Sequence, residues 1–134
     1  MDWKLEVVVV PVSDVDRAKR FYSEQCGFVV DLDDRVSDKL RIVQLTPPGS
    51  ACSITIGSGI AASEPGSLKG VQLVVSDIEA ARAQLSEHGV EVSGFKHFED
   101  GVMTDGQGEG WNSFIFFDDP DSNSWTVQQS AARS

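Results

Sequence analysis

Two stretches of this chain repeat one pattern, and this duplication constrains the fold more than any other feature. An apolar run followed by a Ser-Asp pair and a helix-like segment occurs at Val7–Asp16 and again at Gln72–Arg82. Aligning the two Ser-Asp pairs gives an offset of 63 residues, close to half of the 134 residues. A later pair, Thr46–Ile54 and Asp119–Val127, matches at an offset of 73 residues. The sequence therefore predicts one module present twice, with a net insertion of ten residues late in the second copy.

The first half carries signals for a strand, a helix and three further strands. The valines at 7–10 predict a strand over about residues 4–12 that is buried on both faces. Ser13 is placed to cap the following helix, which runs to about residue 25, and Gly27 ends it. Strands follow over residues 28–32, 41–45 and 52–56.

The second half repeats this plan. It predicts a strand at 71–75, a helix capped by Asp77, and strands at 90–95, 111–117 and 125–129. Residues 99–110 contain four glycines in an acidic segment and predict a mobile loop. We therefore expect an α+β fold of tandem βαβββ modules whose curved sheets form a cup. The modules span about residues 3–57 and 69–130 of a single 1–134 domain, with a Gly/Ser/Ala linker at 57–68.

The charge balance excludes some partners. A net charge of −10 disfavours nucleic acids and anionic membrane surfaces, and it is compatible with a cationic ligand. No apolar run is long enough to span a bilayer and no basic-then-apolar leader is present, so a cytoplasmic location is expected. Cys26 and Cys52 lack CxxC spacing and are expected to be small buried side chains.

Several segments, in this order along the chain, resemble the vicinal oxygen chelate superfamily, which is also called the glyoxalase/bleomycin-resistance/dioxygenase family. The segments are Val12–Ala18 with Phe21-Tyr22 and Gly27-Phe28, Val75–Ala81 with His88-Gly89-Val90, and the turn Asp119–Asn123. The resemblance implies paired βαβββ modules, a homodimer, and a cup that often holds a divalent metal.

The metal site of that family is not matched by this sequence. The resemblance places the first ligand, often His, at Val7, its counterpart in the second module at Gly70, and a Glu ligand at Thr126. Valine and glycine have no side-chain donor, and one threonine hydroxyl is a poor ligand for a divalent metal. We therefore predict no metal site and no cofactor.

The alternation of side chains along the predicted strands places one set of residues on the faces of the cup. These faces are apolar and neutral-polar, which suits a small organic ligand held by hydrogen bonds. The acidic balance is compatible with a cationic ligand, and Trp111 with an aromatic one. The predicted ligand-binding residues are Val7, Val9, Ser53, Thr55, Gln72, Trp111, Thr126 and Gln128. Trp111 could stack on an aromatic ligand or pack against a neighbouring subunit. His97 beside Glu99 is a candidate acid/base pair, and a solvated loop histidine is the alternative.

Three classes of function fit these features. The first is a small-molecule-binding protein that sequesters its ligand without chemistry, as the bleomycin-resistance members do. The second is a glyoxalase- or dioxygenase-type enzyme, which is either metal-dependent through non-standard ligands or metal-independent through His97 or Glu99. The third is an interaction module with collapsed cups. Metal dependence and the recovery of unchanged ligand would distinguish the first two classes.

Overall fold

A computed structural model of the chain describes residues 1–131 and divides them into two compact units. The first unit comprises Met1–Leu68 together with Asp119–Asn123, and the second comprises Lys69–Asp118 and the residues from Ser124 onward. The turn Asp119–Asn123 therefore belongs with the first unit, although the strands on either side of it belong to the second.

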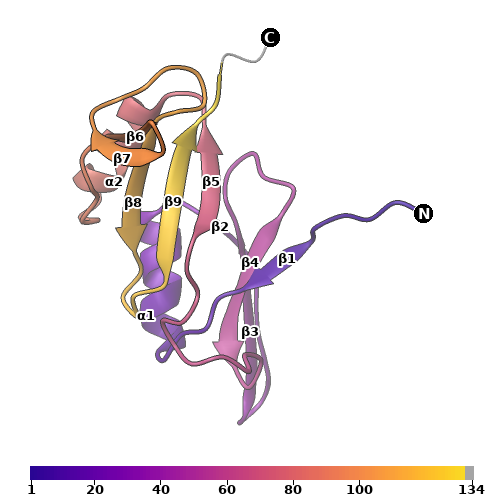
Figure 1. Cartoon of the computed structure of the whole chain (residues 1–134). Coiled ribbons are helices and arrows are strands. Elements are labelled where there is room, and N and C mark those ends of the chain that lie inside the picture. The colour runs from indigo at the N-terminus through magenta and orange to yellow at the C-terminus, as the bar shows by residue number, and fades with distance from the viewer. Residues whose placement is uncertain (132–134) are drawn as a thin grey trace. The chain divides into compact units, whose positions relative to one another are not determined.

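The first unit contains one mixed four-stranded sheet and one helical segment (Figure 1). Its strand order is β1-β4-β3-β2, with β1 parallel to β4 and the other pairs antiparallel. The helix α1 continues directly into a π-helical turn, η1, so the helical segment ends at Gln25 as the sequence predicted. The elements are β1 (Val7–Val9), α1 (Val15–Arg20), η1 (Phe21–Gln25), β2 (Val29–Ser37), β3 (Leu40–Thr46) and β4 (Ser53–Ser58).

The second unit repeats this arrangement and adds one strand. Its order is β5-β9-β8-β6-β7, in which β5 is parallel to β9 and β7 lies outside β6. The elements are β5 (Val71–Val75), α2 (Ile78–Glu87), β6 (Lys96–Glu99), β7 (Val102–Asp105), β8 (Phe114–Asp118) and β9 (Ser124–Gln129). The predicted α+β fold of two βαβββ modules is therefore confirmed.

Each helix packs on one face of its own sheet. Alternate residues of the strands are buried beneath the helix, because successive side chains of a strand point to opposite faces. In the first unit these buried residues are Val43, Leu45, Ile54 and Ile56 with Ala18 and Tyr22 of the helical segment. In the second they are Ile115, Phe117, Trp125 and Val127 with Ile78 and Leu85 of α2. The opposite face of each sheet carries the residues at the alternate positions.

Arg41 attaches β3 to α1 and β2 in the first unit. Its guanidinium donates to Asp33 from Nε (3.0 Å) and Nη2 (2.8 Å), and to Asp16 from Nη1 (2.8 Å). Arg41 is 9% exposed, and its hydrogen bonds to Asp33 and Asp16 raise its own pKa. Hydrogen bonds from Arg41 and then from Lys19 hold the pKa of Asp33 well below its ordinary value. The hydrogen bond from Arg41 also lowers the pKa of Asp16.

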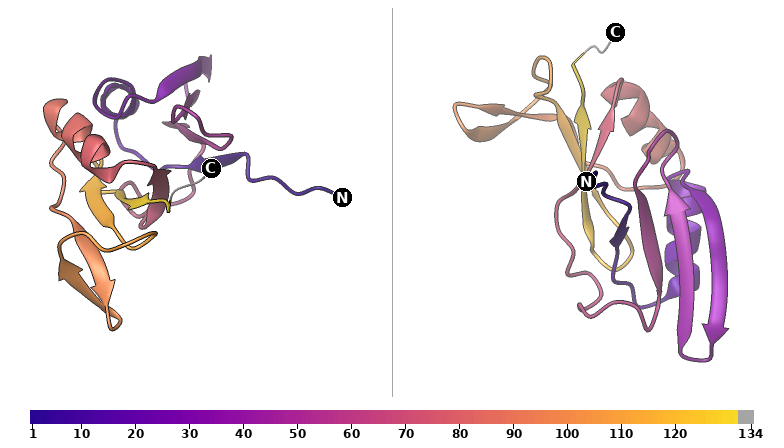
Figure 2. Two further views of the ribbon diagram at one scale, coloured as in Figure 1. Left: turned by 90° about the horizontal axis from the view of Figure 1, so that it is seen from above. Right: turned by 90° about the vertical axis from the view of Figure 1, so that its right-hand side faces the viewer.

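The prediction of a mobile loop at 99–110 was wrong, because much of this segment belongs to a β-hairpin. Figure 2 shows β6 and β7 as this hairpin at the edge of the second sheet. Asp100 (φ 51°) and Gly101 (φ 78°) form its two-residue turn with both φ angles positive, as a type I′ turn requires. The Asp-Gly dipeptide is a signal for a two-residue hairpin turn, and the number of glycines in the segment concealed it.

Three further local predictions differ from the structure. Asp14, not Ser13, caps α1 by accepting a hydrogen bond from the Arg17 amide, whereas Asp77 caps α2 as predicted. The predicted strand at 90–95 is reduced to an isolated bridge between Val92 and Phe117. The strand predicted from Trp111 begins only at Phe114, because residues 106–113 form a loop held by its own hydrogen bonds.

The strand β1 is not buried on both faces as predicted. Val7 and Val9 are 37% and 41% exposed, because β1 is an edge strand of its sheet and α1 covers only one face of that sheet.

Candidate functional site

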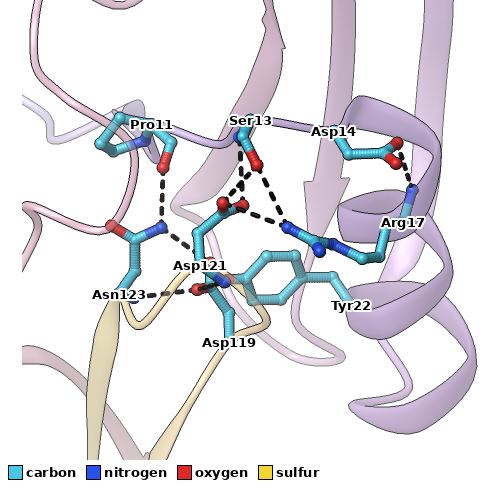
Figure 3. Close-up of polar contacts among 8 residues, drawn as sticks. All are labelled: Pro11, Ser13, Asp14, Arg17, Tyr22, Asp119, Asp121 and Asn123. Carbon is cyan, nitrogen blue, oxygen red and sulfur yellow. Dashed lines mark hydrogen bonds and ion pairs between the residues drawn. The ribbon is translucent and has the colours of Figure 1, made fainter.

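A polar network in the first unit joins the start of α1 to the turn Asp119–Asn123 (Figure 3). The Ser13 amide donates to Asp121 Oδ2 (3.1 Å), and the Ser13 hydroxyl donates to Asp121 Oδ1. Arg17 Nη2 donates to Asp121 Oδ1 (3.2 Å) and to Ser13 Oγ (3.1 Å). Ser13 therefore fixes the turn, which is a role that its proximity to the helix start did not reveal.

The buried part of this network centres on Asp119, which is 5% exposed. Its Oδ2 accepts from Tyr22 Oη (2.7 Å) and Asn123 Nδ2 (2.8 Å), and its Oδ1 accepts from the backbone amides of Asp121 and Asn123. Asn123 Nδ2 also donates to the Pro11 carbonyl (2.8 Å). Because the carboxylate of Asp119 already accepts four hydrogen bonds, its role is to stabilise the fold, and the network is not a candidate catalytic site.

Cys26 lies in the same core. Burial, and secondarily the charge of Asp119, raise the pKa of its thiol to about 12. The thiol is therefore protonated at neutral pH and is a poor nucleophile, which agrees with the sequence prediction of a small buried side chain.

The four predicted ligand-binding residues of the first half lie on one sheet face. In the β1–β4 register, Val7 is opposite Ser53 and Val9 is opposite Thr55. The Ser53 hydroxyl lies 2.6 Å from that of Thr46, whose hydroxyl also donates to Asp31 Oδ2. The first face is thus apolar along β1 and rich in hydroxyl groups along β4, with a carboxylate from β2 added.

Sequence reasoning missed Asp31 and Thr46. Thr46 could have been predicted, because it lies one residue beyond the predicted strand at 41–45 and continues the alternation of buried and partly exposed side chains along it. Asp31 could not, because the β2–β3 register shifts between Val30 and Leu32 and this irregularity changes which side chains share a face.

The predicted residues of the second half also come together, on the face of the second sheet opposite α2. Gln72 is opposite Thr126 in the β5–β9 register. Gln72 Nε2 donates to Gln128 Oε1, and Gln128 Nε2 donates to the Trp111 carbonyl (2.7 Å). This amide chain joins β5, β9 and the loop before β8, and it fixes the position of the Trp111 backbone.

Aromatic side chains that the sequence reasoning did not single out lie on this second face. Phe114 is opposite Gln128, and Phe116 is opposite Thr126, in the β8–β9 register. The Phe98 ring on β6 contacts the Phe114 ring edge-on, with centroids 5.5 Å apart and planes at 77°. The signal for Phe114 and Phe116 was their alternation with the buried Ile115 and Phe117.

Comparison with known proteins agrees with this architecture. The sequence profile described as "Glyoxalase/Bleomycin resistance protein/Dioxygenase superfamily" matches residues 4–127. The chain belongs to this superfamily. No curated protein matches it.

Several solved structures are similar to this chain over almost its whole length. TnmS3, an antibiotic-binding protein from Streptomyces sp. CB03234, is 31% identical with a TM-score of 0.79, and the alignment covers 97% of this chain and 98% of TnmS3. A glyoxalase/bleomycin resistance protein from the same organism is 32% identical with a TM-score of 0.75, covering 94% and 100% of the two chains. A superfamily member from Sphaerobacter thermophilus DSM 20745 shares the fold at 24% identity and a TM-score of 0.76, covering 96% and 98%.

The donor groups of this superfamily member do not fit a divalent metal at the positions that the resemblance indicates. Val7 and Gly70 offer no side-chain donor. Thr126 offers one hydroxyl, and its neighbours Gln72 and Gln128 are amides that bond to each other. Among residues 1–131, no group of three or more His, Cys, Asp or Glu side chains is placed to hold a metal ion.

His97 and Glu99 lie on the other face of β6. Because side chains alternate along β6, His97 and Glu99 point to the face away from the Phe98 side chain. The nearby Phe95 ring lies beneath Arg82 of α2, with its centroid 5.8 Å from the guanidinium carbon of Arg82. His97 Nδ1 donates to the Gly106 carbonyl (2.8 Å), and its Nε2 lies 3.6 Å from Glu99 Oε2. The structure therefore brings this pair together on the α2 side, and proton transfer by it stays a prediction.

Proposed function

We propose that this protein binds a small organic molecule of the antibiotic type and releases it chemically unchanged. The observation that carries the proposal is the second sheet face, where a hydrogen-bonded amide chain lies beside partly exposed aromatic rings. A binding surface needs such a combination of apolar area for affinity and a few fixed polar groups for orientation. The likeness to the antibiotic-binding TnmS3 over nearly the full length of both chains supports it.

Each sheet face is proposed by itself as a binding surface. The residues are Val7, Val9, Ser53 and Thr55 on the first face, and Gln72, Trp111, Thr126 and Gln128 on the second. Hydroxyl and amide groups can both donate and accept, so they suit a ligand with carbonyl and hydroxyl substituents. The carboxylate of Asp31 beside Thr46 favours a cationic substituent. Catalysis of the glyoxalase or dioxygenase type stays the alternative.

We propose further that residues 1–134 act as a single domain within a homodimer. β1 and β5 each lie at the edge of their own sheet. Each carries half-exposed valines, Val7 and Val9 on β1 and Val74 on β5. Edge strands with exposed apolar side chains are suited to pairing with another chain. None of the helices described up to residue 131 has the length and apolar character needed to cross a membrane, and a cytoplasmic location stays a prediction.

The test uses the full-length protein and a panel of antibiotics with cationic and aromatic members. We expect at least one compound to raise the melting temperature and to be recovered unchanged by mass spectrometry after release. Gln128→Ala should weaken its binding about tenfold, because the amide chain and its hold on the Trp111 loop are lost. Gln84→Ala, on the exposed surface of α2, is the matched control and should bind as the wild type does. Conversion of the compound to a product would favour the enzyme instead.

A further inference from the structure

The ten-residue insertion in the second half enlarges the second sheet face by one strand. In the first sheet, β2 forms the edge next to β3. In the second sheet, β6 occupies the equivalent position next to β8, and β7 is added outside it. The insertion inferred from the two sequence offsets thus corresponds to β7 and the loop that follows it.

The added strand brings an apolar side chain to the aromatic face. Met103 of β7 is opposite Phe98 of β6, and opposite residues of an antiparallel pair share a face. Phe98 is 48% exposed and Met103 is 39% exposed. Lys96 is the residue of β6 directly opposite Phe114, and Phe98 lies diagonal to Phe114, with its ring in edge-on contact. Phe114, Phe98 and Met103 therefore form a diagonal row across β8, β6 and β7. Because neighbouring strands lie about 4.8 Å apart, the row crosses roughly 10 Å of the sheet from β8 to β7, and the diagonal step adds to its length.

The row is held in place by hydrogen bonds that do not involve its own side chains. Asn112 Oδ1 accepts from the Phe98 amide, and Asn112 Nδ2 donates to the Phe98 carbonyl, each at 2.8 Å. Lys96 and Asp105, also opposite each other, form an ion pair between β6 and β7 on the same face, beside Phe114. A surface fixed in this way, with apolar side chains bordered by an ion pair, is organised before any ligand arrives, which reduces the entropy lost on binding.

We infer that the ligand of this face is a planar, fused aromatic system, an inference that rests on the proposed function. The Phe98 and Phe114 rings are nearly perpendicular, so a flat ring system that stacks on one of them meets the other edge-on. Both arrangements are favourable for aromatic pairs. The Met103 thioether adds a polarisable contact with an aromatic ring. A span of three strands fits a fused ring system better than a single ring, and Gln128 beside Phe114 offers hydrogen bonds to a carbonyl on its edge.

Two neutral probes test this inference on the full-length protein by ligand-observed NMR titration. Fluorenone is planar, whereas benzophenone has the same two rings and carbonyl without the bond that holds them flat. We expect fluorenone to bind at least about fivefold more tightly, and Phe98→Leu and Met103→Ala each to weaken fluorenone about three- to tenfold. Phe98→Leu keeps apolar area and removes the ring. Val102→Ala, whose side chain lies on the other face of the same hairpin, is the matched control and should leave binding unchanged.

Each other outcome overturns the inference. Equal affinity for the two probes would mean that the protein does not prefer a planar ligand. Fluorenone binding that Phe98→Leu and Met103→Ala do not affect would mean that the ligand does not bind on this surface. Failure of fluorenone to bind while an antibiotic of the panel binds would reject the planar ligand and leave the proposed function standing. Failure of every compound to bind would reject both. Circular dichroism and melting temperature establish that each variant is folded.

Discussion

The two halves of this protein share a framework and differ in the sheet face opposite the helix. The first face carries valines, hydroxyl groups and the carboxylate of Asp31, whereas the second carries amides and phenylalanines. The residues beneath the helices are apolar in both halves. Duplication has thus preserved the positions that hold each unit together and allowed the others to diverge, which is why the superfamily fold alone does not identify a ligand.

The turns before the last strand of each half give the sharpest contrast. In the second half the buried Asp119 accepts four hydrogen bonds, whereas the first-half turn at residues 47–50 is anchored by the exposed Ser50, whose hydroxyl donates to the Cys52 carbonyl. Asp119→Ala should destabilise the protein by about 3–5 kcal/mol, because buried donors lose their acceptor. Ser50→Ala should cost about 0.5 kcal/mol. Urea unfolding measures both, and similar losses would contradict the contrast.

Different arginine contacts hold the helix in each unit. Arg41 of β3 pairs with carboxylates of α1 and β2, whereas Arg82 of α2 donates from Nε to the neutral carbonyl of Ser93 (2.8 Å), in the segment between α2 and β6. Arg41→Met should destabilise by about 2 kcal/mol at neutral pH and Arg82→Met by about 1 kcal/mol. Because the pKa of Asp33 is depressed in the folded state, its contribution is present above the unfolded value of 3.8 and is lost as pH falls below it.

The difference in the free energy of unfolding between wild type and Arg41→Met should therefore become smaller as pH falls from about 7 to about 3. The gap for Arg82→Met should change little over the same range, since its acceptor is a neutral carbonyl. Urea titrations of the three proteins at both pH values provide the measurement. A gap for Arg41→Met that stays constant in acid would show that the ion pair is not its source.

Ser122 offers a smaller effect and a gain of stability. It has φ 73° in the second-half turn, while the first-half turn uses Gly49 at φ 85°. A left-handed conformation costs a residue with a side chain about 1 kcal/mol, so Ser122→Gly should stabilise the protein by up to about that amount. Gly49→Ser should destabilise it by a similar amount. Differential scanning calorimetry measures both shifts, and a lower melting temperature for Ser122→Gly would refute the explanation.

The duplication was readable from sequence because helix starts, apolar alternation and the two offsets are local patterns. The same offsets revealed a ten-residue insertion, but its structure was misread because four glycines outweighed the Asp100-Gly101 hairpin signal. The local pattern predicts Ser13 as a helix cap, and it could not reveal the partner that Ser13 contacts, because Asp121 lies 108 residues away. The carboxylate of Asp31 was missed because a register shift cannot be read from alternation alone.

The assignment of Asp119–Asn123 to the first unit also affects how the protein folds during synthesis. Tyr22 and Asp119 are 97 residues apart, and Pro11 and Asn123 are 112 residues apart. A ribosome that has made only the first half has therefore produced a Tyr22 hydroxyl and a Pro11 carbonyl whose partners do not yet exist. Contacts of such long sequence separation form late and slow folding. The first unit therefore cannot be completed until residue 123 has been made, shortly before the last strand of the second unit, and the two halves cannot mature as independent copies.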